Sequence, residues 1–216
     1  MDYKIILGDQ KTDEWQKLRE GKITGSVAKQ VKGTGNAFLY ETLAMMTTKR
    51  DPKQARGEHV DRGIELEPEA RAAYVGQTGF QVFTVAFIEN GRLGISPDGI
   101  VFKKKVSTVK GNLSLSSIKK IDRLLEIKCP DTNNHIRYII ENRLPAEHKD
   151  QVIHAFVTID DLEEVDFVSY DPKFKHKPLH IITIRRSDLI VDISTAKVAY
   201  DRFLQKLDKY YSTLVL

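Results

Sequence analysis

The sequence predicts a mixed α/β domain (α+β), in which a central sheet is flanked by helices. Three observations support this fold class. Helical patterns fill the first third of the chain, β-branched and aromatic residues alternate in the middle third, and the last third combines helices with strands. The chain of 216 residues has the length of one domain, and neither an internal repeat nor a linker divides residues 1–216.

The first third contains four predicted helices. The stop signals are glycines and an Asp-Pro pair, which mark the ends of helices. These signals place helices at residues 12–20, 26–31, 37–48 and about 55–77. Pro68 lies inside the fourth, where its ring should kink the helix or begin a new one.

The middle third predicts short strands joined by turns. Residues 80–88 alternate in the strand pattern, and further strands are expected at residues 93–96, 100–104 and 121–128. The segment 103–120 is rich in lysine and serine, so we expect a hairpin or loop insertion there. Its lysines would either contact an anionic partner or form a solvated loop.

The last third predicts helices and strands in turn. Helices are expected at about 133–142 and 147–159, strands at 165–170 and 179–185, and a final helix at about 194–212. The final helix places an apolar stripe on one face, which requires a core or a partner to cover it. Its members are Ala199, Phe203, Leu207 and Tyr210.

Composition excludes several classes of protein. Hydrophobic residues make up 41% and charged residues 30%, which argues against a disordered chain and against membrane-spanning helices. The N-terminus shows no signal-peptide core, so we expect a cytoplasmic protein without a membrane partner. The single cysteine, Cys129, excludes an intrachain disulfide and a cysteine-rich zinc or iron–sulfur site. A net charge of +4 permits an anionic partner such as nucleic acid.

Two carboxylates and a lysine form the strongest chemical pattern. Asp98 lies in the turn Ser96-Pro97-Asp98-Gly99, and Glu126 and Lys128 lie in the strand Leu125-Glu126-Ile127-Lys128. Because residues i and i+2 of a strand share a face, Glu126 and Lys128 project together while Ile127 faces the other way. Carboxylates can hold Mg²⁺ together with water and phosphate oxygens, and a lysine can polarise the attacking water.

Each part of this pattern also has an ordinary structural interpretation. Pro-Asp-Gly is a common turn, and Glu-x-Lys is common as a solvated pair on a strand. The combination is more specific than its parts. A Pro-Asp turn, a Glu-Ile-Lys strand end and an upstream acid, Glu67, on a helix together favour phosphodiester hydrolysis.

With these motifs in order, the chain resembles the lambda-exonuclease-like alkaline exonucleases, also called YqaJ-type viral recombinases, of the PD-(D/E)xK nuclease superfamily. The resemblance covers most of the chain, although the stretch between Asp98 and Glu126 is longer than expected. The segments that carry it are Trp15–Arg19, Ile23–Ser26, Gly63–Arg71, Ser96–Gly99, Leu125–Pro130, His148–Val152 and Tyr170–Pro172.

The resemblance implies roles for particular residues. Asp98 and Glu126 would bind the metal with the Ile127 carbonyl as a further ligand, and Lys128 would activate water. Glu67 would be an additional acid beside the metal, and Gln151 would position water or a ligand, or else is an ordinary helical residue. The implied cofactor is Mg²⁺, which Mn²⁺ can replace.

A second group of residues lies near the N-terminus. Arg19 ends one predicted helix, and Thr24-Gly25-Ser26 begins the next, which presents hydroxyls and free N–H groups where a helix dipole favours an anion. Ser26 alone would more often be an N-cap. The resemblance implies that Arg19, Ser26 and Thr24 bind the 5′-terminal phosphate of DNA.

The sequence therefore predicts a Mg²⁺-dependent exonuclease that digests linear double-stranded DNA from 5′ to 3′. It would release 5′-mononucleotides and leave a 3′ single strand for phage-type annealing recombination. The resemblance implies a homotrimeric ring and a single-strand annealing protein as partner. Two alternatives stay open: a structure-specific or restriction-type endonuclease of the same fold, and a non-catalytic DNA-binding module.

Overall fold

Five strands form a mixed central sheet in the computed structural model of the chain, which describes residues 2–33, 35–48, 58–109 and 112–215. Their order across the sheet is β10-β9-β8-β5-β2. Strands β8 and β9 run parallel, and the other three pairs are antiparallel. The strands are β2 (Gln81–Phe83), β5 (Gly99–Phe102), β8 (Arg123–Lys128), β9 (Glu164–Tyr170) and β10 (Leu179–Arg185).

The parallel pair explains why two helices lie between β8 and β9. Parallel neighbours need a crossover connection, and here it contains α5 (Thr132–Glu141), the 3₁₀ turn η3 (Ala146–His148) and α6 (Lys149–Thr158). Helix α6 returns across one face of the sheet, where its apolar side chains join the main core. The crossover therefore brings α6 beside the strand that carries Glu126 and Lys128.

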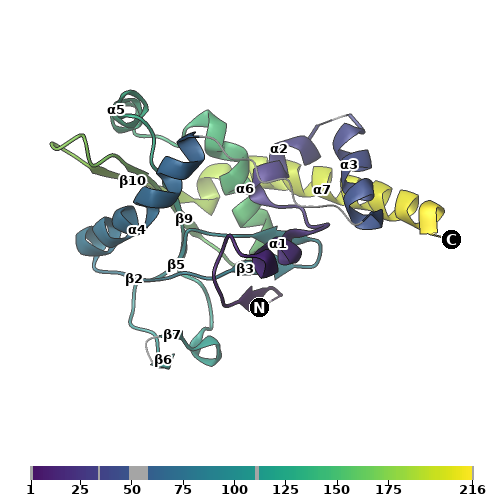
Figure 1. Ribbon diagram of the computed structural model, residues 1–216, viewed down its shortest axis with the longest axis horizontal. Helices are drawn as coiled ribbons and strands as arrows, with labels where there is room; N and C mark the ends of the chain where they lie inside the picture. Colours follow the sequence, from purple (N-terminus) through teal and green to yellow (C-terminus); the bar gives the residue numbers. More distant parts are fainter. Residues whose placement is uncertain (1, 34, 49–57, 110–111, 216) are drawn as a thin grey trace.

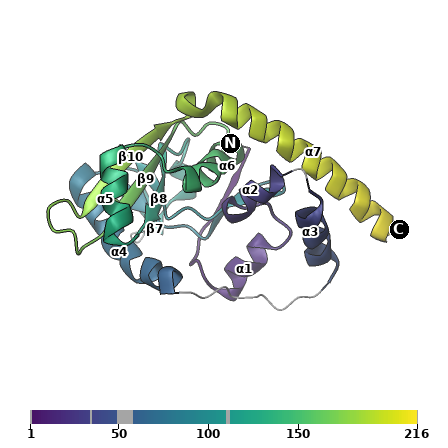
Figure 2. The same cartoon turned by 90° about the horizontal axis from the view of Figure 1, so that it is seen from above.

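Helices cover both faces of the sheet, as Figures 1 and 2 show. Helix α4 (Glu58–Thr78) packs Ala70 and Tyr74 against Leu125, Ile127 and other side chains of one face. The opposite face, with Leu124 and Phe167, packs against α6 and α7 (Ile190–Val215), which follows the 3₁₀ turn η4 (Arg186–Leu189). The predicted arrangement of a central sheet flanked by helices is confirmed.

A second, three-stranded sheet has the order β1-β3-β4. Its antiparallel strands are β1 (Lys4–Ile6), β3 (Phe87–Asn90) and β4 (Leu93–Ile95). Strand β1 is absent from the sequence prediction because three residues carry too little alternation. Pairing with β3 stabilises it instead.

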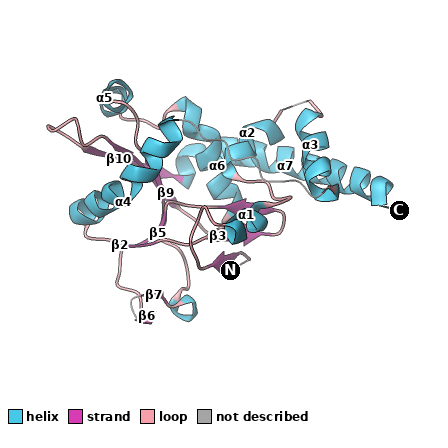
Figure 3. Ribbon diagram, viewed as in Figure 1, coloured by secondary structure: helices cyan, strands magenta, loops and turns pink. Residues whose placement is uncertain are grey.

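Four shorter helical elements lie near the N-terminus. They are α1 (Asp13–Arg19), the 3₁₀ turn η1 (Gly25–Val27), α2 (Ala28–Val31) and α3 (Ala37–Thr47). Figure 3 shows α2 and α3 beside α6 and α7, and α1 beside β3. Thr12 caps α1 by accepting a hydrogen bond from the N–H of Trp15 at 3.1 Å. The predicted helix over 26–31 is therefore partly wrong: a 3₁₀ turn precedes a four-residue α-helix.

Residues 80–88 do not form the single strand that the alternation predicts. Strand β2 pairs with β5 in the central sheet, whereas β3 pairs with β1 and β4 in the smaller sheet. The chain changes sheets between them, and Ala86 donates its N–H to the Ile6 carbonyl at 3.0 Å. Local alternation cannot distinguish one strand from two that share an apolar pattern.

The predicted insertion contains a short antiparallel pair, β6 (Thr108–Val109) with β7 (Asn112–Leu113), followed by the 3₁₀ turn η2 (Leu115–Ser117). This segment projects from the sheet on the side away from α6 and α7 (Figure 1). Leu113 and Ile118 are nevertheless buried in the main core. The segment is therefore anchored at its base.

The structure excludes one of the two alternatives for Pro68 and corrects the prediction for the last helix. Helix α4 continues through Pro68, so the proline does not begin a new helix; packing of Ala70 and Tyr74 on the sheet stabilises the turns that follow it. The start predicted at Ala55 lies outside the described residues. Helix α7 begins at Ile190, and Tyr200 rather than Ala199 occupies its buried stripe with Phe203 and Leu207.

Among the described residues, no helix combines the length and the apolar character that crossing a membrane requires.

Candidate active site

Asp98 and Glu126 are cross-strand neighbours. The pairing of β5 with β8 sets Gly99 opposite Leu125, and Asp98 extends this ladder by donating its N–H to the Leu125 carbonyl at 3.1 Å. One further step in the same register places Asp98 beside Glu126 on the sheet face that α6 covers. The Asp98 carboxylate then accepts a hydrogen bond from the Ile127 N–H at 2.6 Å.

Burial makes this pair of acids electrostatically unfavourable without a cation. Burial and the nearby Glu126 charge raise the pKa of Asp98 above its ordinary value, against the opposing effects of Lys128 and the Ile127 N–H. The Lys128 ammonium forms an ion pair with Glu126. Burial acts to lower the pKa of Lys128, but Glu126 and Asp98 outweigh it and raise that pKa overall. The site therefore concentrates negative charge that one lysine only partly neutralises.

Gln151 contacts this group from α6. Its side-chain amide donates to Glu126 Oε1 at 2.6 Å. Gly25 lies against the same side chain, because a Cβ at position 25 would stand 3.1 Å from Gln151 Cγ. A larger residue at position 25 would therefore require the Gln151 side chain to shift by a few tenths of an ångström.

Glu67 reaches the site from the other face of the sheet, on α4. Arg71, one helical turn later, donates to Glu67 Oε1 at 2.5 Å and to the Asp98 carbonyl at 3.0 Å. Lys11 Nζ lies 3.3 Å from Glu67 Oε2. Arg71 thus fixes the acidic residue of α4 to the turn that carries Asp98.

Arg19, Ser26 and Thr24 lie together beside Ser96. The Arg19 guanidinium donates to Ser96 Oγ at 3.1 Å and to Ser26 Oγ at 3.4 Å, and the Thr24 and Ser26 hydroxyls are 3.1 Å apart. Trp15 supports the guanidinium, whose carbon lies 4.4 Å from the ring centroid. Ser96 precedes Asp98 by two residues, so this group adjoins the acids.

The helix dipole contributes less here than the sequence suggests. The segment that begins at Gly25 is a three-residue 3₁₀ turn followed by four α-helical residues, too short for a large aligned dipole. An anion at this place would depend on the Arg19 cation and the hydroxyls. Burial lowers the pKa of Arg19, yet a guanidinium stays protonated at neutral pH.

The oxygen donors suit a hard divalent cation. No group of three or more His, Cys, Asp or Glu side chains in metal-binding geometry occurs within the described ranges. Mg²⁺, however, typically takes one or two protein carboxylates and completes its shell with water and phosphate oxygens. Asp98 and Glu126 supply two carboxylates whose unfavourable burial a cation would relieve, so the residues present fit Mg²⁺.

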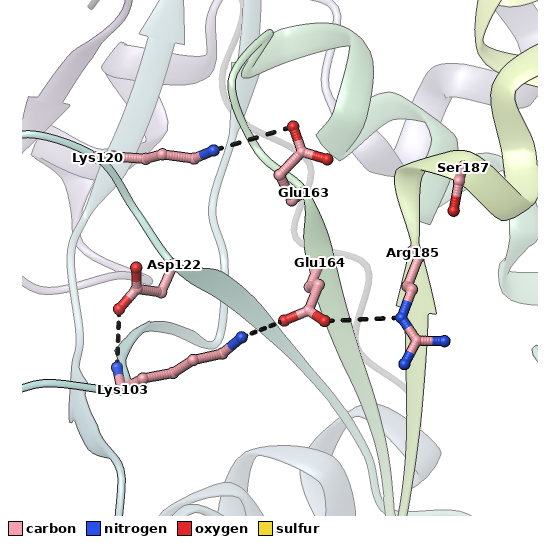
Figure 4. A pocket seen from close by; sticks show the side chains of 7 residues that line it. All are labelled: Lys103, Lys120, Asp122, Glu163, Glu164, Arg185 and Ser187. Carbon is pink, nitrogen blue, oxygen red and sulfur yellow. Dashed lines mark hydrogen bonds and ion pairs between the residues drawn. The ribbon is translucent and has the colours of Figure 1, made fainter.

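Two other features do not belong to this site. Burial raises the pKa of the Cys129 thiol to about 11, which makes it a packed residue rather than a nucleophile. A cavity of about 420 Å³ lies at the opposite ends of β5 and β8, lined by Lys103, Asp122 and Glu164 among others (Figure 4). Its lysines pair with Glu163 and Glu164, which leaves the wall largely neutralised.

Several contacts in the site were not predicted from the sequence. Arg71 follows Glu67 at the helical i,i+4 spacing, and Trp15 precedes Arg19 at the same spacing, so both pairings had a detectable signal. The contacts of Lys11 and Ser96 had no such signal in the sequence, because only the tertiary fold brings the loop before α1 and the turn before Asp98 together.

A mixed central sheet that presents two carboxylates and a lysine at a strand end defines the class of protein as a nuclease. Residues 14–159 match the YqaJ-like viral recombinase domain, and the chain belongs to that family. The resemblance drawn from the sequence motifs is therefore confirmed.

Solved structures agree with this assignment. An alkaline exonuclease from Laribacter hongkongensis, LHK-Exo, is 28% identical with a TM-score of 0.74, covering 94% of this chain and 96% of its own. LHK-Exo in complex with dAMP matches with a TM-score of 0.72 and the same identity and coverage. A phage-related exonuclease from Haemophilus somnus, 14% identical over 86% of this chain and 96% of its own with a TM-score of 0.53, shares the fold. Comparison with curated proteins found no match.

Proposed function

We propose that the chain is a Mg²⁺-dependent DNA exonuclease that digests linear duplex from 5′ to 3′ and releases 5′-mononucleotides. The observation that supports this most is the cross-strand pair Asp98 and Glu126 with Lys128 beside it, next to the Arg19 and Ser26 group. The first group suits hydrolysis of a phosphodiester, and the second suits retention of a terminal phosphate. Their adjacency favours attack near an end rather than within the duplex.

Each residue has a defined task in this proposal. Asp98 and Glu126, with the Ile127 carbonyl, would hold the cation, which would stabilise charge on the phosphoryl oxygens and lower the pKa of water. Lys128 holds the Glu126 carboxylate and can orient the attacking water. Gln151 donates to the same Glu126 oxygen as Lys128 and so helps to hold that carboxylate. Glu67, held by Arg71, can accept a proton from water. Mn²⁺ could replace Mg²⁺ in such an oxygen site.

The proposed polarity depends on the Arg19 group. A guanidinium with two hydroxyls binds a terminal phosphate dianion better than a 5′-hydroxyl. The related LHK-Exo has been solved in complex with dAMP, a mononucleotide, which supports the product proposed for this chain. A 3′ single strand would remain for an annealing protein, the partner that we propose for phage-type recombination.

Digestion of labelled duplex tests this function directly. With linear duplex labelled at the 5′ or the 3′ end, we expect the 5′ label to be released first as a mononucleotide, only when Mg²⁺ is present. Chelation with EDTA should stop the reaction. Early release of the 3′ label would contradict the polarity, and cleavage of a closed circular duplex would favour the endonuclease alternative. Binding without hydrolysis would favour the non-catalytic module.

We further propose that the chain assembles as a homotrimeric ring. One chain of this size cannot encircle a duplex, whereas a cyclic trimer closes with one repeated head-to-tail contact. Helix α7 extends beyond the sheet (Figure 2) and exposes Val191 and Val198, apolar side chains that a neighbour can cover.

The ring predicts both a mass and a mode of digestion. Light scattering at micromolar concentration should give a mass near three chains. After excess competitor DNA is added, each bound enzyme should still degrade a long tract, because a closed ring cannot leave the duplex between cuts. A monomer that digests distributively would contradict the ring without affecting the hydrolytic site.

A further inference from the structure

Lys11 stands at the edge of the candidate active site in an unusual backbone conformation. Its φ is +68°, in the left-handed region that side chains other than glycine, asparagine and aspartate rarely adopt. Such strain persists only where surrounding contacts impose it, and it gathers at functional sites. The position therefore calls for an explanation beyond that of an ordinary surface lysine.

Gln10, the preceding residue, anchors the chain at this point. Its side-chain amide donates to the Val85 carbonyl at 3.0 Å and to the Pro97 carbonyl at 2.8 Å. Pro97 directly precedes Asp98, so the loop before α1 is fixed to the turn that carries this acid. Lys11 consequently lies next to the anchored residue, with its ammonium beside Glu67 at the edge of the site.

The Lys11 ammonium is the accessible cation of this edge. It lies 3.3 Å from Glu67 Oε2, while Arg71 already occupies Glu67 Oε1. The Lys11 side chain is 47% exposed and that of Arg71 only 18%. Glu67 is thus neutralised without Lys11, and of the two cations Lys11 is the one that a substrate can reach.

From these observations we propose that Lys11 binds a backbone phosphate of the bound duplex, distinct from the terminal phosphate beside Arg19. The inference rests on the proposed function. A polyanion that approaches Asp98, Glu126 and Glu67 meets strong repulsion, and a lysine at their edge offsets it. An exposed ion pair with Glu67 contributes little by itself, so it does not explain the strained backbone. Lys11 is therefore a substrate-positioning residue rather than a catalytic one.

Binding measurements with Lys11→Gln test this contact. With Ca²⁺ in place of Mg²⁺ and a duplex that carries 5′-hydroxyl ends, the dissociation constant should rise about fivefold. The slope of log K against log salt should become less steep by about 1, the loss of one phosphate contact. A duplex with 5′-phosphate ends should show the same change, because the contact is independent of the terminal phosphate. In Mg²⁺, KM should rise while kcat stays near its original value.

Lys17→Gln is the matched control. Lys17 is an exposed lysine of α1, two residues from both Trp15 and Arg19 and therefore on a different face of the helix, and it forms no ion pair within the described part of the chain. Its replacement removes the same charge and should change neither the dissociation constant nor the salt slope. Lys11→Arg should restore most of the binding.

Glu67→Gln distinguishes contact with DNA from an effect through Glu67. If Lys11 binds phosphate itself, Lys11→Gln weakens binding equally in the native and the Glu67→Gln backgrounds. Loss of the effect in the Glu67→Gln background would overturn the proposal, as would an unchanged salt slope in Lys11→Gln. If the unaltered chain neither binds nor digests linear duplex, the proposed function fails as well; if it digests duplex and Lys11→Gln binds normally, only the Lys11 contact fails.

Discussion

Hydrolysis of linear duplex in Mg²⁺ is expected to fall by at least about 10²–10³-fold in each of Asp98→Ala, Glu126→Ala and Lys128→Ala. In the proposed site the two carboxylates are the acidic ligands of the cation, and removing either leaves only one of them. Lys128 is held against Glu126 and lies among the acids, where its charge can act on the attacking water. Initial rates on end-labelled duplex at saturating Mg²⁺ measure the effect.

Measuring the binding of duplex distinguishes a loss of catalysis from a loss of DNA binding in these variants. Lys128→Ala should weaken binding of duplex in Ca²⁺ less than it slows cleavage in Mg²⁺, because in the proposed mechanism the lysine acts on water rather than as a ligand of the cation. Near-normal turnover by Lys128→Ala would contradict the role proposed for it.

Asp98→Asn tests how the Asp98 carboxyl makes the stability of the fold depend on pH. Burial and Glu126 raise the pKa of Asp98 in the folded chain above its value in the unfolded chain. Such a carboxyl stabilises the fold while protonated, and this contribution is lost as pH rises toward the raised pKa. In EDTA, the free energy of unfolding of the unaltered chain should therefore fall as pH rises from the ordinary aspartate pKa to about 8. The free energy of unfolding of Asp98→Asn should fall less over the same pH range. Urea denaturation at several pH values measures it, and a steeper fall in the variant would contradict the electrostatic account.

The second large effect concerns the 5′ end of the substrate. A duplex with 5′-phosphate ends should be digested about tenfold faster than one with 5′-hydroxyl ends, because hydrogen bonds to a charged group are stronger than those between neutral groups. Arg19→Ala combined with Ser26→Ala should erase the difference. Arg19 already donates to Ser26 and Ser96 and stacks on Trp15, so its guanidinium is preorganised for a phosphate.

The comparison of the two ends also contains its own control. The double variant should digest 5′-hydroxyl duplex at nearly the rate of the unaltered enzyme, since the Asp98 and Glu126 pair is intact. Equal rates on both ends in the unaltered enzyme would remove the phosphate pocket and leave Arg19 and Ser26 as structural residues. A loss of all digestion in the double variant would instead indicate that the group supports the fold.

The sequence by itself determined the elements of the site whose geometry is local. Alternation along a strand places Glu126 and Lys128 on one face, and the structure pairs them. The breaks at glycine and proline located most helices within a few residues, because those residues limit backbone conformation whatever the tertiary context. The order and spacing of the motifs identified the family.

Only the tertiary structure decided which distant residues meet. The register of β5 against β8 brings Asp98 beside Glu126, and the crossover between β8 and β9 brings Gln151 to the same carboxylate. The division of residues 80–88 between two sheets, the short 3₁₀ turn at Gly25 and the strained Lys11 likewise depend on partners far along the chain. Local patterns record the preferences of neighbouring residues, whereas pairing between strands and packing across a sheet are set by the free energy of the whole fold.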